Sequence, residues 1–285
     1  MIVSIIGVGL LGGSLALSLR EKYPKMTLLG VDRSVVHQKI AVAKGIVDRV
    51  AELDEAIALS ELLVLSTPVD VISGLLPEVL DKIPAGRTVM DFGSTKELIC
   101  GIADRHPKRA QFVAVHPMAG TENSGPGAAF KELLPQQHVI ICDKEKSDPD
   151  SVALVEALLR DIGMKIHYMN PVEHDLHLAY VSHLSHVSSF ALGLTVLEKE
   201  KDEKAIFRMA GTGFSSTVRL AKSSPQMWAP IFNQNKVNVS RALGDYIEYL
   251  QKFKAAIDSD ELDSSLEYMT RSNDIRRILE GIEKK

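Results

Sequence analysis

The sequence predicts an α/β N-terminal domain built on a parallel β-sheet, followed by an all-α C-terminal domain. Up to about residue 170, short apolar segments alternate with amphipathic helical segments, a pattern typical of a parallel sheet with crossover helices. A long segment from residue 172 to about 199 then has helical spacing and no proline, and we expect helices from there to the C-terminus. Because 285 residues exceed the chain length that a single hydrophobic core usually stabilises, we expect two domains, residues 1–170 and 171–285.

The first predicted strand runs into a glycine-rich turn and then a helix. Its apolar residues 2–6 suit a strand buried on both faces, and G-x-G-x-x-G follows at residues 7–12. Such a turn lets a pyrophosphate approach the backbone at the N-terminus of the helix, where unpaired N–H groups favour an anion. We therefore predict a Rossmann-type dinucleotide-binding sheet. The residues expected at the dinucleotide here are Gly7, Gly9, Leu10, Leu11 and Gly12.

Two further strand ends contribute to the predicted cofactor site. The second strand, residues 27–32, ends in Asp32, where a carboxylate accepts hydrogen bonds from the adenosine ribose. Asp32 favours NAD over NADP because a 2′-phosphate would meet a like charge, although Arg33 beside it softens that rejection. Residues 61–66 form another strand, and we expect Thr67 and Pro68 after it under the nicotinamide ribose, a plain strand end being an equal alternative for each.

Candidate catalytic residues follow the next two predicted strands. Residues 87–91 lead into Gly93, Ser94 and Thr95, and either hydroxyl could cap the helix that follows. Residues 111–116 deliver His116 at a strand end, before a proline and a glycine-containing loop. The carboxyl ends of parallel strands are where α/β proteins place their chemistry, so His116 is the leading candidate.

Composition excludes several classes of function. A net charge of −4 and no basic patch with interleaved aromatic residues argue against nucleic acid as a partner. Cys100 and Cys142 are the only cysteines and have no metal-ligand spacing, so we expect two buried thiols and no metal site. The N-terminal apolar run is too short for a membrane span or a signal peptide, and we expect a cytoplasmic protein.

Five segments carry a family resemblance. They are GVGLLGGS from Gly7, DFGSTK from Asp91, HPMAGTE from His116, SHLSH from Ser182 and RLAKSSPQMW from Arg219. In this order they resemble the prephenate dehydrogenases of tyrosine biosynthesis, whose close relatives act on arogenate. The resemblance implies NAD-dependent oxidative decarboxylation of prephenate, with His116 taking the ring-hydroxyl proton and Ser94 orienting that hydroxyl. With neither a preceding chorismate mutase segment nor a following regulatory domain, the chain resembles the family's monofunctional form.

The resemblance also assigns substrate-binding residues. Arg219 would bind a substrate carboxylate through its planar guanidinium, with Lys222 as the competing cation on the same segment. His186 would help to hold the substrate and Arg219, Thr121 would line the pocket and Glu122 its mouth. The helical half would form a homodimer.

Alternatives remain at the histidines and for the function as a whole. On an uninterrupted helix His174 and His177 lie opposite His183 and His186, which argues against a four-histidine metal site and leaves the first two as packed or surface residues. A β-hydroxyacid dehydrogenase would need a lysine on the long helix, and residues 171–197 contain none. A non-enzymatic NAD-binding regulator is the other rival. Preference between prephenate and arogenate stays open.

Overall fold

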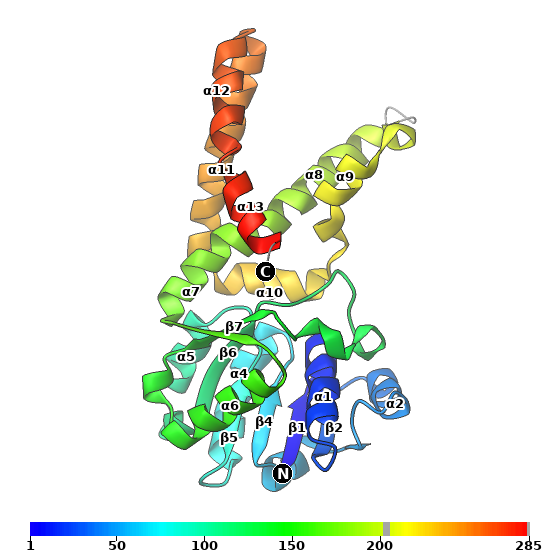
Figure 1. The fold of residues 1–285 in the computed structure, drawn as a ribbon, viewed down its shortest axis with the longest axis vertical. Coiled ribbons are helices and arrows are strands. Elements are labelled where there is room, and N and C mark those ends of the chain that lie inside the picture. The colour runs from blue at the N-terminus through cyan, green and yellow to red at the C-terminus, as the bar shows by residue number, and fades with distance from the viewer. Residues whose placement is uncertain (202–205, 284–285) are drawn as a thin grey trace. The chain divides into compact units, whose positions relative to one another are not determined.

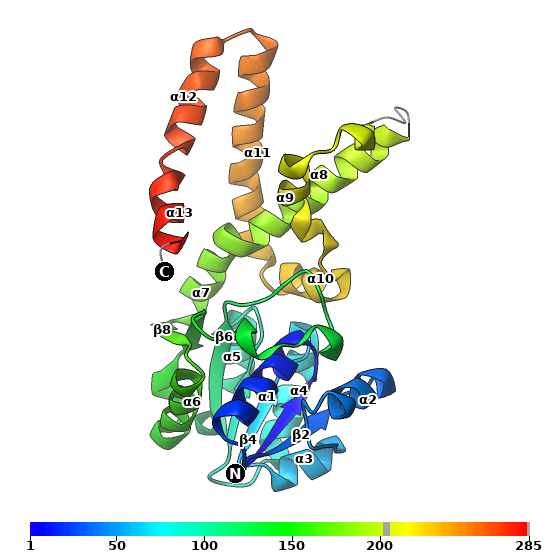
Figure 2. The same cartoon turned by 45° about the vertical axis from the view of Figure 1, so that its right-hand side comes forward.

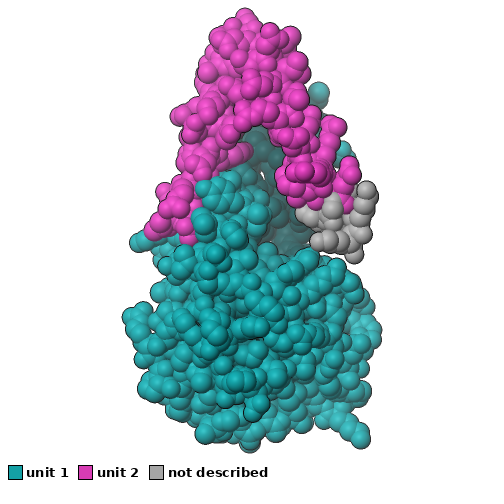
Figure 3. Space-filling view, turned by 60° about the vertical axis from the view of Figure 1, so that its left-hand side comes forward, with its two compact units in different colours: residues 1–236 teal, residues 237–285 magenta. Residues whose placement is uncertain are grey.

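A computed structural model describes residues 1–201 and 206–283. The chain divides into two compact units, residues 1–236 and residues 237–285, coloured separately in Figure 3. Among the described residues, no helix combines the length and apolarity that crossing a membrane requires. All the predicted site residues lie in the first unit.

The first unit contains an eight-stranded sheet in the order β3-β2-β1-β4-β5-β6-β7-β8. All neighbouring strands are parallel except β6 and β7. The predicted parallel sheet is therefore confirmed with one exception, because residues 138–142 return antiparallel to β6. The strands are β1 (Ile2–Ile6), β2 (Thr27–Val31), β3 (Arg49–Val50), β4 (Leu62–Leu65), β5 (Thr88–Asp91), β6 (Phe112–Pro117), β7 (His138–Cys142) and β8 (Lys165–Met169).

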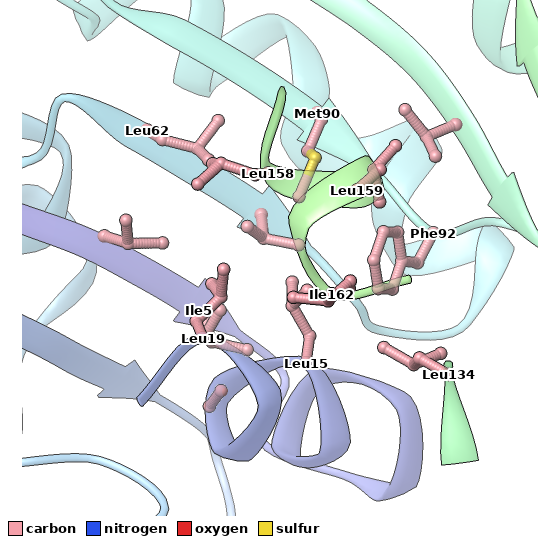
Figure 4. Close-up of a cluster of buried hydrophobic side chains, with 14 of the residues drawn as sticks. Ile5, Leu15, Leu19, Leu62, Met90, Phe92, Leu134, Leu158, Leu159 and Ile162 are labelled. Carbon is pink, nitrogen blue, oxygen red and sulfur yellow. The ribbon is translucent and has the colours of Figure 1, made fainter. Parts of the chain in front are cut away.

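Helices cover both faces of this sheet (Figures 1 and 2). One face packs on α1 (Leu10–Lys22), α2 (Val35–Ala43) and α6 (Pro149–Asp161), through a core that includes Leu15, Leu158 and Leu159 (Figure 4). The other face packs on α3 (Leu53–Leu59), α4 (Val69–Lys82) and α5 (Glu97–Ala103). The central strands β1, β4, β5 and β6 are buried on both faces by these layers, as the apolar runs predict.

The core of the second face also includes residues from the helical half. Leu178 of α7 (Pro171–Leu178) and Trp228 and Ile231 of α10 (Pro225–Gln234) join the side chains of α4 and α5 in one apolar cluster. This shared core places the predicted substrate-binding segments at the sheet. Asn170 caps α7 by accepting a hydrogen bond from the Glu173 N–H, and Pro171 occupies its first turn as predicted.

The predicted long helix is helical but not uniform. A π-helical segment, Ala179–His183, separates α7 from α8 (Leu184–Glu200). The sequence also predicts a loop over the charged residues 198–204, but residues 198–200 belong to α8. Residues 202–204 of that loop, and Ala205 after it, lie outside the described part of the chain. A short 3₁₀ helix (Ile206–Met209), α9 (Thr212–Thr217) and a 3₁₀ turn (Arg219–Lys222) follow.

The C-terminal part contains more helices than the sequence predicted. After the Arg219 segment we expected two, whereas the described residues form α10 and three more. In the second unit, α11 and α12 run side by side in opposite directions and Phe253 packs edge-on against Tyr268 (Figure 2). The helices are α11 (Lys236–Asp258), α12 (Leu262–Ser272) and α13 (Ile275–Glu283). The unit leaves large apolar side chains exposed, among them Ile257, Leu262 and Leu266.

Candidate active site

Five of the predicted site residues lie at the carboxyl ends of strands, along one edge of the sheet. The turns after β1, β2, β4 and β5 and the end of β6 carry, in spatial order from the outer strand, Asp32, Gly7, Thr67, Ser94 and His116. Strand order reverses between β1 and β4. In open α/β sheets, ligands bind outside the carboxyl ends of the strands at such a reversal.

The backbone of the glycine turn is packed so closely that side chains at Gly7 and Gly12 would overlap it. Gly7 has φ of 93°, and a Cβ added there would lie 2.7 Å from the Ser66 carbonyl oxygen. A Cβ at Gly12 would lie 2.3 Å from the Gly7 carbonyl oxygen, so only glycine allows α1 to start this close to β1. Gly9 is the N-cap of α1 and gives it no side-chain cap, and a Cβ there would meet nothing within 4 Å. The turn thus presents the N-terminus of α1, with the half-buried Leu10 and Leu11, toward open space.

The other predicted cofactor residues fit a dinucleotide at this turn. The Asp32 carboxylate accepts hydrogen bonds from the Val8 N–H at 3.2 Å and the Ser34 N–H at 2.8 Å, which ties the end of β2 to the glycine turn. Thr67 Oγ1 is buried with no partner within the described part of the chain, and a ligand hydroxyl could supply one. Pro68 is the N-cap of α4. Arg33 is exposed.

His116 is buried at the end of β6, only 7% exposed. Its Nδ1 lies 2.8 Å from Nε2 of His174 on α7, which leaves its Nε2 for a ligand. Burial holds the pKa of the His116 imidazole well below its usual value, and electrostatic interaction with His174, Lys96 and His183 lowers it further. The imidazole is therefore neutral near pH 7 and can accept a proton.

A buried charged cluster lies under the Ser94 turn. Lys96 and Asp91 are both fully buried and form an ion pair at 2.5 Å, and the Lys96 ammonium also donates to the Gly93 carbonyl. Ser94 itself is half-buried in this turn. The ion pair therefore holds together the two ends of the turn that presents Ser94.

The predicted hydroxyl cap of α5 is wrong. Neither Ser94 nor Thr95 caps the helix. Instead the Asp175 carboxylate, from α7, accepts hydrogen bonds from the backbone N–H groups of Lys96 at 2.7 Å and Glu97 at 3.0 Å. Thr95 instead bonds to Gln234 of α10. Side chains distant in sequence have replaced the local cap.

The residues predicted to bind substrate form two contacts. Arg219 lies 3.2 Å from the Glu122 carboxylate, an exposed ion pair between the loop after β6 and the 3₁₀ turn. His186 stacks on Trp228, with ring centroids 3.4 Å apart, and burial lowers the pKa of its imidazole. Thr121, in the loop with Glu122, accepts a hydrogen bond from the Asn123 N–H.

Sequence reasoning missed the positions of His174, Asp175 and Lys96. His174 is fully buried against His116, with its Nδ1 2.7 Å from Asp175. The helical-wheel argument that separated His174 from His183 assumed one regular helix, and the π-helical segment between them changes the angular spacing. The available signal in the sequence was the presence of the polar residues His174 and Asp175 near the start of a helix that begins at Pro171.

Comparison with known proteins gives a consistent result. Residues 15–168 match the family model for the nucleotide-binding domain of prephenate dehydrogenase, and residues 170–271 match that for its dimerization domain. A cyclohexadienyl dehydrogenase from Zymomonas mobilis is 30% identical over 97% of this chain and 95% of its own length.

Solved structures of related enzymes resemble nearly the whole chain. The crystal structure of prephenate dehydrogenase from Aquifex aeolicus, in complex with hydroxyphenyl propionate and NAD⁺, has a TM-score of 0.88 and 31% identity over 98% of both chains. That of Synechocystis arogenate dehydrogenase has a TM-score of 0.75 and 26% identity, over 98% of this chain and 100% of that one.

Proposed function

This chain belongs to the prephenate dehydrogenase family, and from that premise we propose that it catalyses the NAD-dependent oxidative decarboxylation of prephenate to 4-hydroxyphenylpyruvate. The observation that carries this proposal is His116. It is a neutral, buried imidazole at the carboxyl end of β6, with Nδ1 engaged by His174 and Nε2 left for the substrate. An imidazole in this state is suited to take a proton from a hydroxyl.

The chain's own residues would hold the cofactor. We assign the pyrophosphate to the backbone of the turn from Gly7 to Gly12, the adenosine ribose to Asp32 and the nicotinamide ribose to Thr67 and Pro68. The open space beside Gly9 supports this assignment, as does the buried Thr67 hydroxyl, which has no hydrogen-bond partner among the described residues. When bound, NAD supplies the hydride acceptor.

We assign the proton transfer and the orientation of substrate to this chain's side chains. His116 Nε2 takes the proton of the ring hydroxyl as the carbinol carbon loses its hydride, and Ser94 orients that hydroxyl. Arg219 holds a substrate carboxylate, His186 supports it, and Thr121 and Glu122 line the entrance. The oxidised ring then loses its carboxylate as carbon dioxide, because the released electron pair completes an aromatic ring.

Arogenate is the alternative substrate. It differs from prephenate only by an amino group in place of the side-chain keto group, and the Synechocystis relative is an arogenate dehydrogenase. Steady-state NADH formation with prephenate, with arogenate and with neither tests both proposals. We expect turnover with prephenate. Turnover with arogenate but not with prephenate would make arogenate the substrate. If neither compound led to NADH formation, both proposals would be contradicted.

We propose the same division into domains as above, with residues 1–170 binding the dinucleotide and residues 171–285 binding substrate and forming the homodimer. The family models meet between residues 168 and 170, which supports this boundary. The exposed apolar side chains of α11 to α13 and the match to a dimerization domain support the homodimer. We also propose a cytoplasmic location, where the free thiols of Cys100 and Cys142 stay reduced.

A further inference from the structure

Three side chains form a continuous hydrogen-bonded row that ends at the proposed base. Asp175 Oδ1 lies 2.7 Å from His174 Nδ1, and His174 Nε2 lies 2.8 Å from His116 Nδ1. All three side chains are buried, with exposed fractions of 2%, 0% and 7%. Solvent therefore cannot readily exchange for either partner of His174.

The proton positions along this row follow from the first acceptor. A carboxylate can only accept, so the hydrogen between Asp175 and His174 belongs to His174 Nδ1. Burial lowers the pKa of His174, which keeps its ring neutral, and its Nε2 then carries a lone pair. That lone pair can only accept from His116 Nδ1, and a neutral His116 protonated at Nδ1 has its own lone pair at Nε2.

We propose that Asp175, acting through His174, sets the tautomer of His116 so that Nδ1 carries the proton and Nε2 the lone pair that faces substrate. Asp175 and His174 are thus positioning residues for the reaction. The expected effect of these two residues on turnover rests on the proposed function, whereas the tautomer assigned to His116 does not.

The surroundings of Asp175 keep it an acceptor. Its two oxygens also receive the backbone N–H groups of Lys96 and Glu97, so every hydrogen bond that the structure gives this carboxylate is one it accepts. Asn235 Nδ2 donates to the Asp175 backbone carbonyl at 2.6 Å, which holds this residue's main chain. The same side chain therefore starts α5, directly after the Ser94 turn, and orients the imidazole row.

The titratable groups around the row of Asp175, His174 and His116 are either neutral or paired with an opposite charge. His116 faces His174 from α7, Lys96 from the turn before α5 and His183 from the π-helical segment. The Lys96 ammonium is paired with Asp91, and burial lowers the pKa of His183 to about 4. Near pH 7 the three imidazoles are neutral, so the tautomer rather than the charge of His116 is the variable that Asp175 controls.

The direct test is the protonation of His116 in the full chain labelled with ¹⁵N-histidine. Long-range ¹H–¹⁵N spectra at pH 7 distinguish the two ring nitrogens, and His116→Asn assigns the signal. We expect Nε2 unprotonated and Nδ1 protonated. The opposite pattern would overturn the proposal. This readout needs neither substrate nor NAD, so it stands whether or not prephenate proves to be the substrate.

The functional test is Asp175→Asn. Its amide NH₂ turned toward His174 would force the reverse tautomer along the row, so we expect kcat to fall about 10²–10⁴-fold while the KM for NAD stays within about twofold. Asp148→Asn is the matched control, because Asp148 caps α6 through the Asp150 and Ser151 N–H groups, away from these histidines. Unchanged kcat in Asp175→Asn would refute the positioning role.

A second pair of variants covers the case in which Asp175→Asn does not fold. In His174→Gln the amide oxygen can still accept from His116 Nδ1, whereas His174→Leu has no acceptor. We expect the glutamine variant to keep a kcat at least about tenfold above that of the leucine variant. Equal turnover in the two folded variants would contradict the proposal.

Discussion

His116 carries the most direct prediction at the level of single residues. Burial, and after it electrostatic interaction with His174, Lys96 and His183, lowers the pKa of its imidazole well below 6.5. The neutral base is therefore fully present above pH 6.5, and kcat should fall only as the pH drops well below it. His116→Asn lacks a comparable base, so we expect a kcat loss of roughly 10²–10⁴-fold and no acidic limb.

Measuring kcat from pH 5 to pH 8, together with NAD affinity and melting temperature, checks this prediction for His116→Asn. NAD affinity should change little because the glycine turn and Asp32 lie on other strands of the sheet. A joint loss of stability and NAD affinity with an intact acidic limb would instead indicate a packing role, and His186 would be the next candidate base.

Arg219 is the residue whose replacement should affect substrate binding most. It is exposed and paired with Glu122 at 3.2 Å, so its contribution is partly screened by solvent. For Arg219→Ala we expect KM for prephenate to rise about 10- to 100-fold with a smaller change in kcat. Arg219→Lys should recover little, because an ammonium lacks the two-pronged geometry. If KM were unchanged, Lys222 would be the anchor, which Lys222→Ala would show.

Among the elements, the first turn of α1 leaves no room for a side chain at Gly12. A Cβ at Gly12 would overlap the Gly7 carbonyl oxygen at 2.3 Å, so Gly12→Ala must move α1 away from β1. We expect at least about a tenfold loss of NAD affinity, measured by calorimetry, and a lower melting temperature. Gly74→Ala in α4 is the control, because a Cβ there meets nothing within 4 Å. That variant should bind NAD normally and gain about 0.5–1 kcal/mol of stability.

Local patterns predicted the elements whose signals lie within a few residues. The apolar runs of β1, β4 and β6 and the glycine turn were found because burial on two faces and close backbone contact each require particular residues. Strand β7 and its antiparallel direction were not predicted, because the composition of a buried strand does not indicate the direction in which it pairs. The Asp175 cap was missed because its partners lie 79 and 78 residues away, and no local pattern records such a pairing.

The whole molecule should lose stability on acidification because of its buried imidazoles. His116, His174 and His183 all have pKa values below 6.5 in the folded chain, so the unfolded chain binds more protons below that pH. Their stabilising effect is complete above pH 6.5 and is lost as the pH falls toward the folded-state values. For His183, a shift from 6.5 to about 4 corresponds to about 3 kcal/mol.

Melting temperatures measured between pH 4.5 and pH 7.5 check this expectation. The wild-type curve should fall below pH 6.5, and His183→Gln should make it shallower. His177→Gln, at an exposed position of α7, is the matched control and should leave the slope unchanged. Equal slopes in all three proteins would exclude His183 as a cause of the loss of stability at low pH.

The apolar cluster shared by α4, α5, α7 and α10 bears on how this protein could be recombined with its relatives. Residues 171–236 contribute Leu178, Trp228 and Ile231 to a core whose other half lies on the sheet helices. A chimaera joined at residue 170 would therefore pair two halves of a core that had not evolved together. Exchanging the substrate-binding half between family members would require exchanging the facing side chains of α4 and α5 with it. Although the sequence divides into two domains at residue 170, the two halves share one hydrophobic core.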